Sequence, residues 1–411
     1  TKGTTEETAE GMSMGTIETI IKALRDGTFQ WKPVRRVYIP KKDGKKRPLG
    51  LPDWPSKMVQ EVMRLMLNAY YEPQFSERSH GFRPERGCHT ALREIKKWDG
   101  TTWFIEGDIS KCFERLDHQV LLSALQEKIH DGPFIKLISE LLEAGYLEDW
   151  KFHATLSGTP QGGVLSPLLA NIYLDKLDKY IERELIPEYT KGKERKKNPA
   201  YQKLVNAVYR RRKQGRTGEA KRLKQQMQQL PSLDPEDPDF RRLKYVRYAD
   251  DFIVGCIGPK SEAEEIKQKL EVFLREQLKL GLSQAKTLIT HARTEKARLL
   301  GYEVQVLHND RKQTNGRRSV NAQIGFQVPK DGIDQKCQDH TEEGKPIHRP
   351  ELLKDTVFTI ISTYQAEYRG LVEYYRLAHD LSHKLPRLKW DMERSLIKTL
   401  AAKLQIPGKQ V

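Results

Sequence analysis

The chain has 411 residues, of which 31% are charged and 37% hydrophobic, so it can bury a substantial core and form two or three domains. Its 72 Lys and Arg outnumber 56 Asp and Glu, and the formal net charge of +16 favours a polyanionic partner such as nucleic acid. No apolar run approaches the ~20 residues that cross a bilayer, and the first residues lack the apolar segment of a signal peptide. We therefore expect a soluble intracellular protein with no membrane partner.

The cysteines of the chain are few and scattered. None stands in a CxxC pair, which argues against a disulfide framework and against a cysteine-rich zinc site. The sequence starts with Thr rather than Met, so we expect that a segment upstream of it is missing.

The first 71 residues predict a helix, a hairpin and a second helix. Apolar residues recur at helical spacing over 15–26, and residues 33–52 alternate on either side of a Lys-Asp-Gly-Lys turn, which is typical of a basic β-hairpin. Residues 56–71 again show helical spacing, which predicts a helix that buries Met58, Val62, Leu65, Met66 and Ala69.

Two later segments carry acidic residues at the ends of predicted strands. Residues 101–109 are β-branched and aromatic until they reach Asp108, so a strand delivers this carboxylate to its own end. Residues 243–258 form two apolar runs on either side of Ala-Asp-Asp, which predicts a hairpin with Asp250 and Asp251 at its turn.

The remaining segments predict a basic insertion and a helical end. Residues 191–229 hold about fourteen Lys or Arg and about two acids before a proline-rich break, so we interpret 191–240 as a basic helical insertion. Residues 311–329 suggest a hairpin around Asn315 and Gly316. From about 351 to 403 the spacing is helical, with tyrosines interleaved among basic residues.

Three acids on neighbouring strands permit a specific chemistry. Like charges repel, so a site that gathers several carboxylates usually holds divalent cations, and hard oxygen ligands favour Mg²⁺. Two such ions would activate a 3′-hydroxyl and neutralise a leaving pyrophosphate, which is nucleotidyl transfer. The alternative for Asp250 and Asp251 alone is a solvated turn.

Several ordered blocks resemble the reverse transcriptase of group II intron-encoded proteins. They are HGFRP, WFIEGDISKCF, GTPQGGVLSPLLANIYLDKLD, VRYADDFIVG, LSQAKTLI and ARLLGYEV, within residues 33–305. The region 364–400 resembles the maturase, or X, thumb of the same family. The resemblance implies an α+β right-hand polymerase, with fingers and palm in 1–345 and a helical thumb in 346–411.

The resemblance also implies the reaction centre. Asp108, Asp250 and Asp251 would bind two Mg²⁺ with the carbonyl of Ile109, and Lys286 would protonate the leaving pyrophosphate, unless it is an ordinary surface lysine. For the nucleotide it implies contacts from residues near the fingertip and the palm, namely Lys45, Arg47, Phe113 and Gln161. The ring of Phe113 would exclude a 2′-hydroxyl and so select dNTPs; packing in the core is its alternative.

Nucleic-acid contacts follow from the same resemblance and from charge. Arg83 and Arg86 would contact template phosphates, and Gly301 and Tyr302 would support the primer end. Basic side chains of the insertion would bind intron RNA through phosphates, chiefly Arg210, Arg211, Arg212 and Lys213, although a solvated helical hairpin is the alternative.

We therefore predict an RNA-directed DNA polymerase of a group II intron that extends a DNA or RNA primer on an RNA template with dNTPs and assists splicing. One rival is a maturase that binds intron RNA while its polymerase site lies idle. Another is a different reverse transcriptase class, such as a retron, diversity-generating or defence-associated enzyme. No cysteine-rich or His-Asn-His cluster appears, so the sequence does not support cleavage of a target strand.

Overall fold

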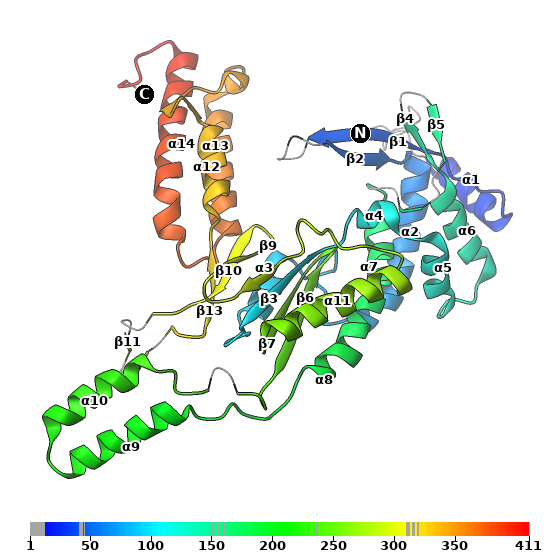
Figure 1. The fold of residues 1–411 in the computed structure, drawn as a ribbon. Coiled ribbons are helices and arrows are strands. Elements are labelled where there is room, and N and C mark those ends of the chain that lie inside the picture. The colour runs from blue at the N-terminus through cyan, green and yellow to red at the C-terminus, as the bar shows by residue number, and fades with distance from the viewer. Residues whose placement is uncertain are drawn as a thin grey trace. The chain divides into compact units, whose positions relative to one another are not determined.

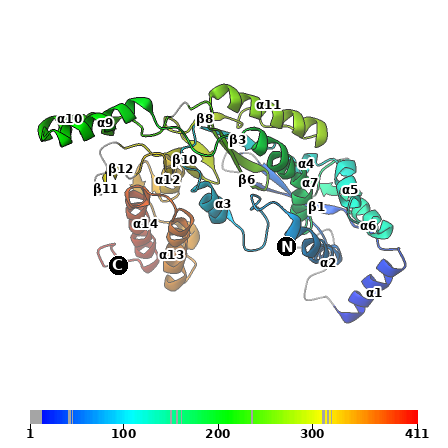
Figure 2. The same ribbon diagram turned by 90° about the horizontal axis from the view of Figure 1, so that it is seen from below.

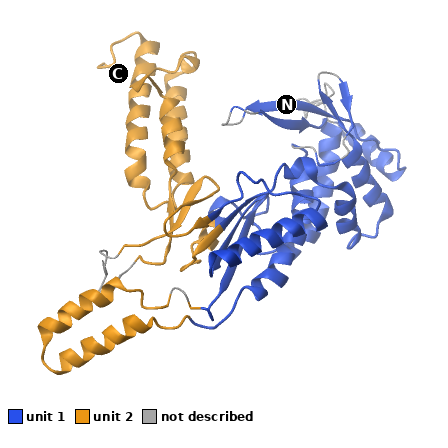
Figure 3. Ribbon diagram, viewed as in Figure 1, with its two compact units in different colours: residues 1–91, 105–194, 238–289 blue, residues 92–104, 195–237, 290–411 orange. Residues whose placement is uncertain are grey.

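The chain forms two compact units in a computed structural model that describes residues 13–40, 44, 46–148, 151–154, 157–159, 162–234, 237–309, 313–314, 317–318 and 320–410. Figure 3 shows the first unit, residues 1–91, 105–194 and 238–289, and the second unit, residues 92–104, 195–237 and 290–411. The second unit thus groups residues 290–345 with the C-terminal helices, whereas the sequence suggested a functional division after residue 345.

A four-stranded sheet forms the centre of the palm, in the order β6 (Arg242–Tyr248), β7 (Asp251–Ile257), β3 (Trp103–Asp108), β8 (Ile289–His291) (Figure 1). Strands β6 and β7 form the predicted antiparallel hairpin. Residues 252–257 are all buried, as expected for an apolar run in a strand that is covered on both faces.

Helices α7 (Ser166–Tyr180) and α11 (Lys260–Gln277) accompany this sheet. The Tyr245 hydroxyl donates to Asp178, so α7 packs on the face of β6 that carries Tyr245. Tyr180 of α7 and Phe273 of α11 stack with their ring centroids 4.1 Å apart, which places the two helices side by side.

The predicted fingertip hairpin is present. Strands β1 (Val34–Pro40) and β2 (Lys46–Leu51) pair antiparallel, with Pro40 opposite Lys46, and β4 (Tyr146–Glu148) and β5 (Lys151–His153) extend the sheet. Lys45, at the tip, lies outside the described residues, whereas Arg47 is exposed on β2. The first predicted helix is α1 (Met14–Arg25), capped by the Ser13 side chain.

Helix α2 (Trp54–Tyr71) confirms the predicted helix but not its predicted buried face. Val62, Leu65 and Met66 are 57%, 55% and 59% exposed, whereas Val59 and Met63 are buried. The segment carries two apolar stripes at helical spacing, and spacing alone does not say which stripe meets the core. The Asp53 carboxylate accepts from the Ser56 amide and fixes the start of the helix.

The chain also contains several shorter helical segments. They are α3 (Cys88–Ile95), α4 (Cys112–Arg115), α5 (His118–Gln126), α6 (Gly132–Glu143), α8 (Ile186–Glu188), the 3₁₀ turn Glu72–Gln74 and the π-helical turn Ile181–Leu185.

The second unit contains the predicted helical insertion and three antiparallel sheets. The insertion is α9 (Pro199–Lys213) and α10 (Thr217–Gln229). A three-stranded sheet has the order β13 (Ile324–Gln327), β10 (Tyr302–Val306), β9 (Ala297–Leu299). The other sheets are two-stranded ribbons, β11 (Gln313–Thr314) with β12 (Arg317–Arg318) and β14 (Thr341–Glu342) with β15 (Lys345–Pro346). The first ribbon matches the hairpin predicted around Asn315 and Gly316, two residues outside the described ones.

Helices α12 (Lys330–Gln338), α13 (Val357–Tyr374) and α14 (Leu381–Leu404) form the C-terminal part, and Pro350–Leu352 is a 3₁₀ turn. Helices α13 and α14 lie side by side in both views (Figure 1, Figure 2), joined by a buried hydrogen bond between the hydroxyls of Tyr364 and Ser395. Of the helices described, none combines the length and the apolar composition needed to cross a bilayer.

Candidate active site

The structure brings the three predicted carboxylates together in the first unit. Strand β3 ends at Asp108, and the turn of the adjacent β6–β7 hairpin carries Asp250, with Asp251 paired opposite Tyr248. The Ile109 amide donates to the Asp250 carbonyl at 3.3 Å, which joins the end of β3 to the turn. Ala249 enters the turn with φ +56°, a left-handed conformation that costs energy for a side chain with a Cβ.

The three carboxylates repel one another. Burial and the Asp108 carboxylate raise the pKa of Asp250. Burial also raises the pKa of Asp251 to about 7, and the charges of Asp250 and Asp108 add to the shift. The Asp108 side chain contributes to this rise both through its charge and as a close neighbour of Asp251.

Two cations partly offset this charge. Lys286 Nζ lies 3.1 Å from Asp108 Oδ1, and this hydrogen bond raises the pKa of Lys286. Arg47, next to the fingertip, acts electrostatically on Asp250 and lowers its pKa. The sequence named both residues; Lys286 contacts the cluster directly, and Arg47 acts on it only through its charge.

The residues fit a divalent cation by their chemistry. Three neighbouring carboxylates whose mutual repulsion raises the pKa of Asp250 and Asp251 supply the hard oxygen donors that Mg²⁺ takes. In the part of the chain that the structure describes, no three His, Cys, Asp or Glu side chains stand in a ready-made metal-binding arrangement.

Phe113 lies at the side of this site on α4. Its side chain is partly exposed rather than buried, and its ring meets that of Phe82 edge to face with centroids 6.1 Å apart. Phe82 is 55% exposed and has φ +57°, a strained conformation for an aromatic residue. The Phe113 carbonyl accepts from the Thr159 amide, so the loop before Gln161 docks on α4. Gln161 itself lies outside the described residues.

Arg83 corrects the sequence interpretation. The Arg83 side chain is 3% exposed, forms an ion pair with Glu72 and donates to the carbonyls of Ser76 and Ser79. A guanidinium with these internal partners cannot also neutralise template phosphates, so Arg83 supports the fold of its segment. Arg86 pairs with Glu77 and is 20% exposed, which leaves it nearer the surface.

Gly301 and Tyr302 form the turn between β9 and β10 in the second unit. Leu300 and Gly301 have φ +48° and +70°, as a two-residue type I′ hairpin requires. Tyr302 is fully buried and donates to the Tyr374 carbonyl, and the Tyr374 hydroxyl donates to the Leu300 carbonyl. Tyr302 therefore packs under the turn and cannot itself touch a primer.

The four predicted RNA-binding residues occupy the last turn of α9. Arg210, Arg212 and Lys213 are exposed, and Arg211 Nε lies 3.1 Å from Glu219 on α10. Cations at a helix C-terminus also stabilise the helix dipole, so this placement serves the helical hairpin as well as any RNA.

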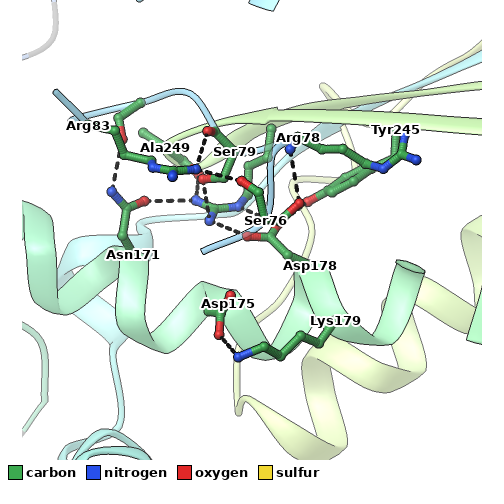
Figure 4. A network of polar contacts seen from close by, with 12 residues as sticks. Ser76, Arg78, Ser79, Arg83, Asn171, Asp175, Asp178, Lys179, Tyr245 and Ala249 are labelled. Carbon is green, nitrogen blue, oxygen red and sulfur yellow. Dashed lines mark hydrogen bonds and ion pairs between the residues drawn. The ribbon is translucent and has the colours of Figure 1, made fainter. Parts of the chain in front are cut away.

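A buried polar network next to the carboxylates escaped the sequence interpretation. Asp178 of α7 forms an ion pair with Arg247 of β6, and both side chains are 0% exposed. Asp178 and Asn171 of α7, and Ser79 of a separate segment, accept hydrogen bonds from the Arg247 guanidinium; the three acceptors are labelled in Figure 4. Burial disfavours a charged guanidinium, yet the Asp178 carboxylate raises the pKa of Arg247 above its usual value. The sequence did offer one signal, an arginine inside an apolar strand. A buried charge needs a buried partner, so this arginine predicts one.

The fold and the carboxylate hairpin define the class of protein. Residues 39–304 match the family model described as "Reverse transcriptase (RNA-dependent DNA polymerase)", and residues 325–410 match "Type II intron maturase". The chain is therefore a reverse transcriptase with a right-hand α+β fold and a maturase domain.

Similar proteins identify the family. The group II intron-encoded protein LtrA of Lactococcus lactis subsp. cremoris is 41% identical over 98% of this chain and 70% of its own length. The COX1/OXI3 intron 1 protein of Saccharomyces cerevisiae is 35% identical over 99% of this chain and 50% of its own length. A telomerase structure from Candida albicans covers 94% of this chain and 62% of its own, with TM-score 0.44 and 12% identity, a likeness too weak to add to the assignment.

The chain belongs to the group II intron-encoded reverse transcriptases and maturases. It is an RNA-directed DNA polymerase with a maturase role in splicing, as the ordered sequence blocks predicted. As a reverse transcriptase it performs nucleotidyl transfer that depends on a divalent metal.

Proposed function

We propose that Asp108, Asp250 and Asp251, with the Ile109 carbonyl, hold two Mg²⁺ ions at the end of β3. When bound, the ions would lower the pKa of a 3′-hydroxyl and neutralise the charge that develops on the nucleotide phosphates. The observation that carries this proposal is the cluster of three carboxylates at the end of β3 and at the turn of the adjacent β6–β7 hairpin.

The chain's cations complete the reaction centre. Lys286 is held protonated beside Asp108 and is 68% exposed, so its ammonium is available to donate a proton to the leaving pyrophosphate. Arg47 would bind the triphosphate as it enters, aided by Lys45 from the same hairpin.

Phe113 and Gln161 would recognise the nucleotide. The partly exposed ring of Phe113, held against Phe82, supports a steric role against a 2′-hydroxyl. We expect Phe113→Ala to raise incorporation of rNTPs relative to dNTPs by about tenfold or more, measured by single-nucleotide extension. Unchanged discrimination would return Phe113 to a packing role.

We propose fewer residues for primer and template contacts than the sequence implied. Arg86 remains a candidate for template phosphates, whereas Arg83 serves the fold of its own segment. The β9–β10 turn at Gly301 would approach the primer with its backbone, supported from below by Tyr302. The primer is DNA or RNA and the substrates are dNTPs.

RNA binding would use the tip of the insertion, at Arg210, Arg211, Arg212 and Lys213, and the helical region 346–411 as the thumb. The exposed position of these cations at the end of α9 supports phosphate contacts with intron RNA. Such work belongs where intron RNA is made, in a bacterial cytoplasm or an organelle.

Primer extension tests the proposal. The full chain with an RNA template, a DNA primer, dNTPs and Mg²⁺ should extend the primer, and extension should stop when EDTA removes the metal. Asp108→Asn should lower the rate about 1000-fold or more, because it removes a metal ligand. The matched control is Asp131→Asn, since Asp131 caps α6 and Asn caps a helix equally well.

Each outcome of this assay separates the alternatives. Inactivity of the wild type with Mg²⁺, together with good binding of intron RNA, would favour a maturase whose polymerase site is idle. Equal activity of Asp108→Asn and Asp131→Asn would remove Asp108 from the reaction centre.

A further inference from the structure

The guanidinium of Arg247 uses all five of its N–H donors inside the protein. Nε and Nη2 donate to the two oxygens of Asp178 at 2.8 and 2.6 Å. The other donors reach three further acceptors, namely Asn171 Oδ1 at 3.1 Å, Ser79 Oγ at 2.9 Å and the Ala249 carbonyl at 2.9 Å. The Tyr245 hydroxyl completes the shell by donating to Asp178 at 2.8 Å.

One of these contacts reaches the catalytic turn. Ala249 directly precedes Asp250 and holds a positive φ, so its peptide needs an external restraint to keep that conformation. The bond from Arg247 to the Ala249 carbonyl supplies this restraint from inside the sheet.

A second segment, residues 78–81, also contacts this turn. The His80 amide donates to the Arg247 carbonyl, and the Arg247 amide donates to the Arg78 carbonyl, so residues 78–80 run beside β6 as a short parallel strand. A Cβ on Gly81 would lie 2.4 Å from the Ala249 nitrogen. Asn171 donates to the Gly81 carbonyl at 2.9 Å and so ties this segment to the same guanidinium.

Apolar residues in place of both Arg247 and Asp178 could fill this space at little loss of stability, since whole buried ion pairs are often replaceable by hydrophobic side chains. The planar guanidinium of arginine directs hydrogen-bond donors to four groups on three segments at fixed angles. An apolar residue or a lysine cannot do this. The geometry therefore favours a role in placing the turn over a role in stability alone.

We propose that Arg247, fixed by Asp178, is a positioning residue that sets the Ala249 peptide and thereby the Asp250 carboxylate for nucleotidyl transfer. This inference rests on the proposed role of Asp250 as a metal ligand. Arg247 does not touch the reacting atoms; it acts through the turn.

Two measurements on the full chain test this. The first is steady-state primer extension, which separates kcat from the KM for dNTP. The second uses Mg²⁺ alone and records the metal concentration that gives half of the thermal stabilisation, without template or nucleotide. For Arg247→Lys we expect kcat to fall at least tenfold, KM for dNTP to stay within threefold, and the Mg²⁺ midpoint to rise several-fold.

Arg241→Lys is the matched control. Arg241 stands just before the other end of β6 and forms an ion pair with Glu262 at 2.8 Å, away from the catalytic turn. This variant should leave kcat and the Mg²⁺ midpoint within twofold of the wild type. Equal effects of the two substitutions would overturn the proposal, because a general loss of packing would then explain both.

Asn171→Ala guards against misfolding of the first variant, since it leaves the Arg247–Asp178 pair intact and removes the link to Gly81. It should lower kcat about threefold to tenfold and shift the Mg²⁺ midpoint in the same direction. An active wild type with Arg247→Lys and Asn171→Ala unchanged would overturn the inference alone. A wild type that neither extends primers nor responds to Mg²⁺ would overturn the proposed function, and the inference with it.

Discussion

Two charged clusters share the β6–β7 hairpin, and the chain treats them in opposite ways. Around Arg247 and Asp178 every charge has its partner, both side chains are fully buried, and the guanidinium has no free donor. Two residues past Tyr248, Asp250 and Asp251 lie among too few cations, and their pKa values are raised. The first cluster needs no ligand to balance its charges, whereas the second has an excess of negative charge that the proposed cations would balance.

This difference shows how one short hairpin can be rigid and reactive together. Repulsion among carboxylates costs stability and is retained at sites that need it for binding. A paired network a few ångströms away keeps the backbone under those carboxylates from relaxing. Substitutions in the two clusters should therefore change the free energy of unfolding in opposite directions, and both changes can be measured on this one protein.

The largest effect is expected at the paired cluster. Asp178→Asn leaves the Arg247 charge buried without its partner and should lower the free energy of unfolding by about 3–5 kcal/mol. Urea unfolding of the full chain measures this. The control is Asp175→Asn, one turn earlier on α7, where burial raises the pKa of a carboxyl that pairs only with Lys179.

Asp175→Asn should change the stability by less than about 1 kcal/mol, because a poorly compensated charge is removed. If both substitutions cost the same, the contrast between paired and unpaired charge in this helix is wrong.

A third group of charges, at the tip of α9, should respond to salt rather than to burial. Replacing Arg210, Arg211, Arg212 and Lys213 with Gln should weaken binding to structured RNA roughly tenfold to a hundredfold near 0.1 M salt. The plot of log K against log salt should lose about 0.7 to 0.9 of its slope for each phosphate contact removed.

Four exposed cations of the first unit provide a matched control for this set: Lys128, Lys136, Lys260 and Arg275. Their replacement with Gln should leave the slope nearly unchanged. Equal slopes for both quadruple variants would mean that the insertion makes no phosphate contacts and that net charge alone drives binding.

At the carboxylate cluster the expected stability effect has the other sign. Asp250→Asn removes one of three repelling charges and should raise the free energy of unfolding by about 0.5–1 kcal/mol in EDTA at pH 7.5. Added Mg²⁺ should stabilise the wild type more than the variant, since binding to the native state alone adds stability. A wild type that is equally stable with Mg²⁺ and with EDTA would contradict a metal site here.

Sequence patterns predicted that these carboxylates lie at strand ends, because each one stands beside an apolar strand. Strand β3 had to end at Asp108, and two apolar runs had to turn at Asp250, so their meeting needed only that the strands be neighbours. The ordered sequence blocks indicated the family, and the resemblance to that family implied that these strands are neighbours.

Patterns failed where a side chain's partner lies far along the chain. Arg83 and Arg247 look alike in the sequence, as single arginines beside aromatic residues, yet both are buried on partners that no local spacing reveals. The prediction of the buried face of α2 was wrong for a related reason. The helix carries two apolar stripes, and the sequence does not say which one packs against the core.

His340 offers a smaller test of the same contrast, on a buried group that is only partly paired. His340 is 3% exposed and its Nε2 lies 4.0 Å from Glu367, while its Nδ1 has no hydrogen-bond partner among the residues that the structure describes. Burial lowers the pKa of His340, Arg349 and Lys336 lower it further, and Glu367 and Asp339 oppose the shift.

Because its pKa is lower in the folded state, His340 takes up its proton more readily in the unfolded chain, whose histidines titrate near pH 6.5. Stability should therefore fall as pH drops below about 6.5, by a fraction of the roughly 1.4 kcal/mol that one pKa unit represents. Urea unfolding at pH 7.5 and 5.5 should show a smaller acid loss for His340→Phe than for the wild type. His383→Phe, at an exposed position, should leave the acid-induced loss of stability as it is in the wild type. If the wild type, His340→Phe and His383→Phe all lose the same stability, the partners of His340 offset its burial as fully as those of Arg247 do.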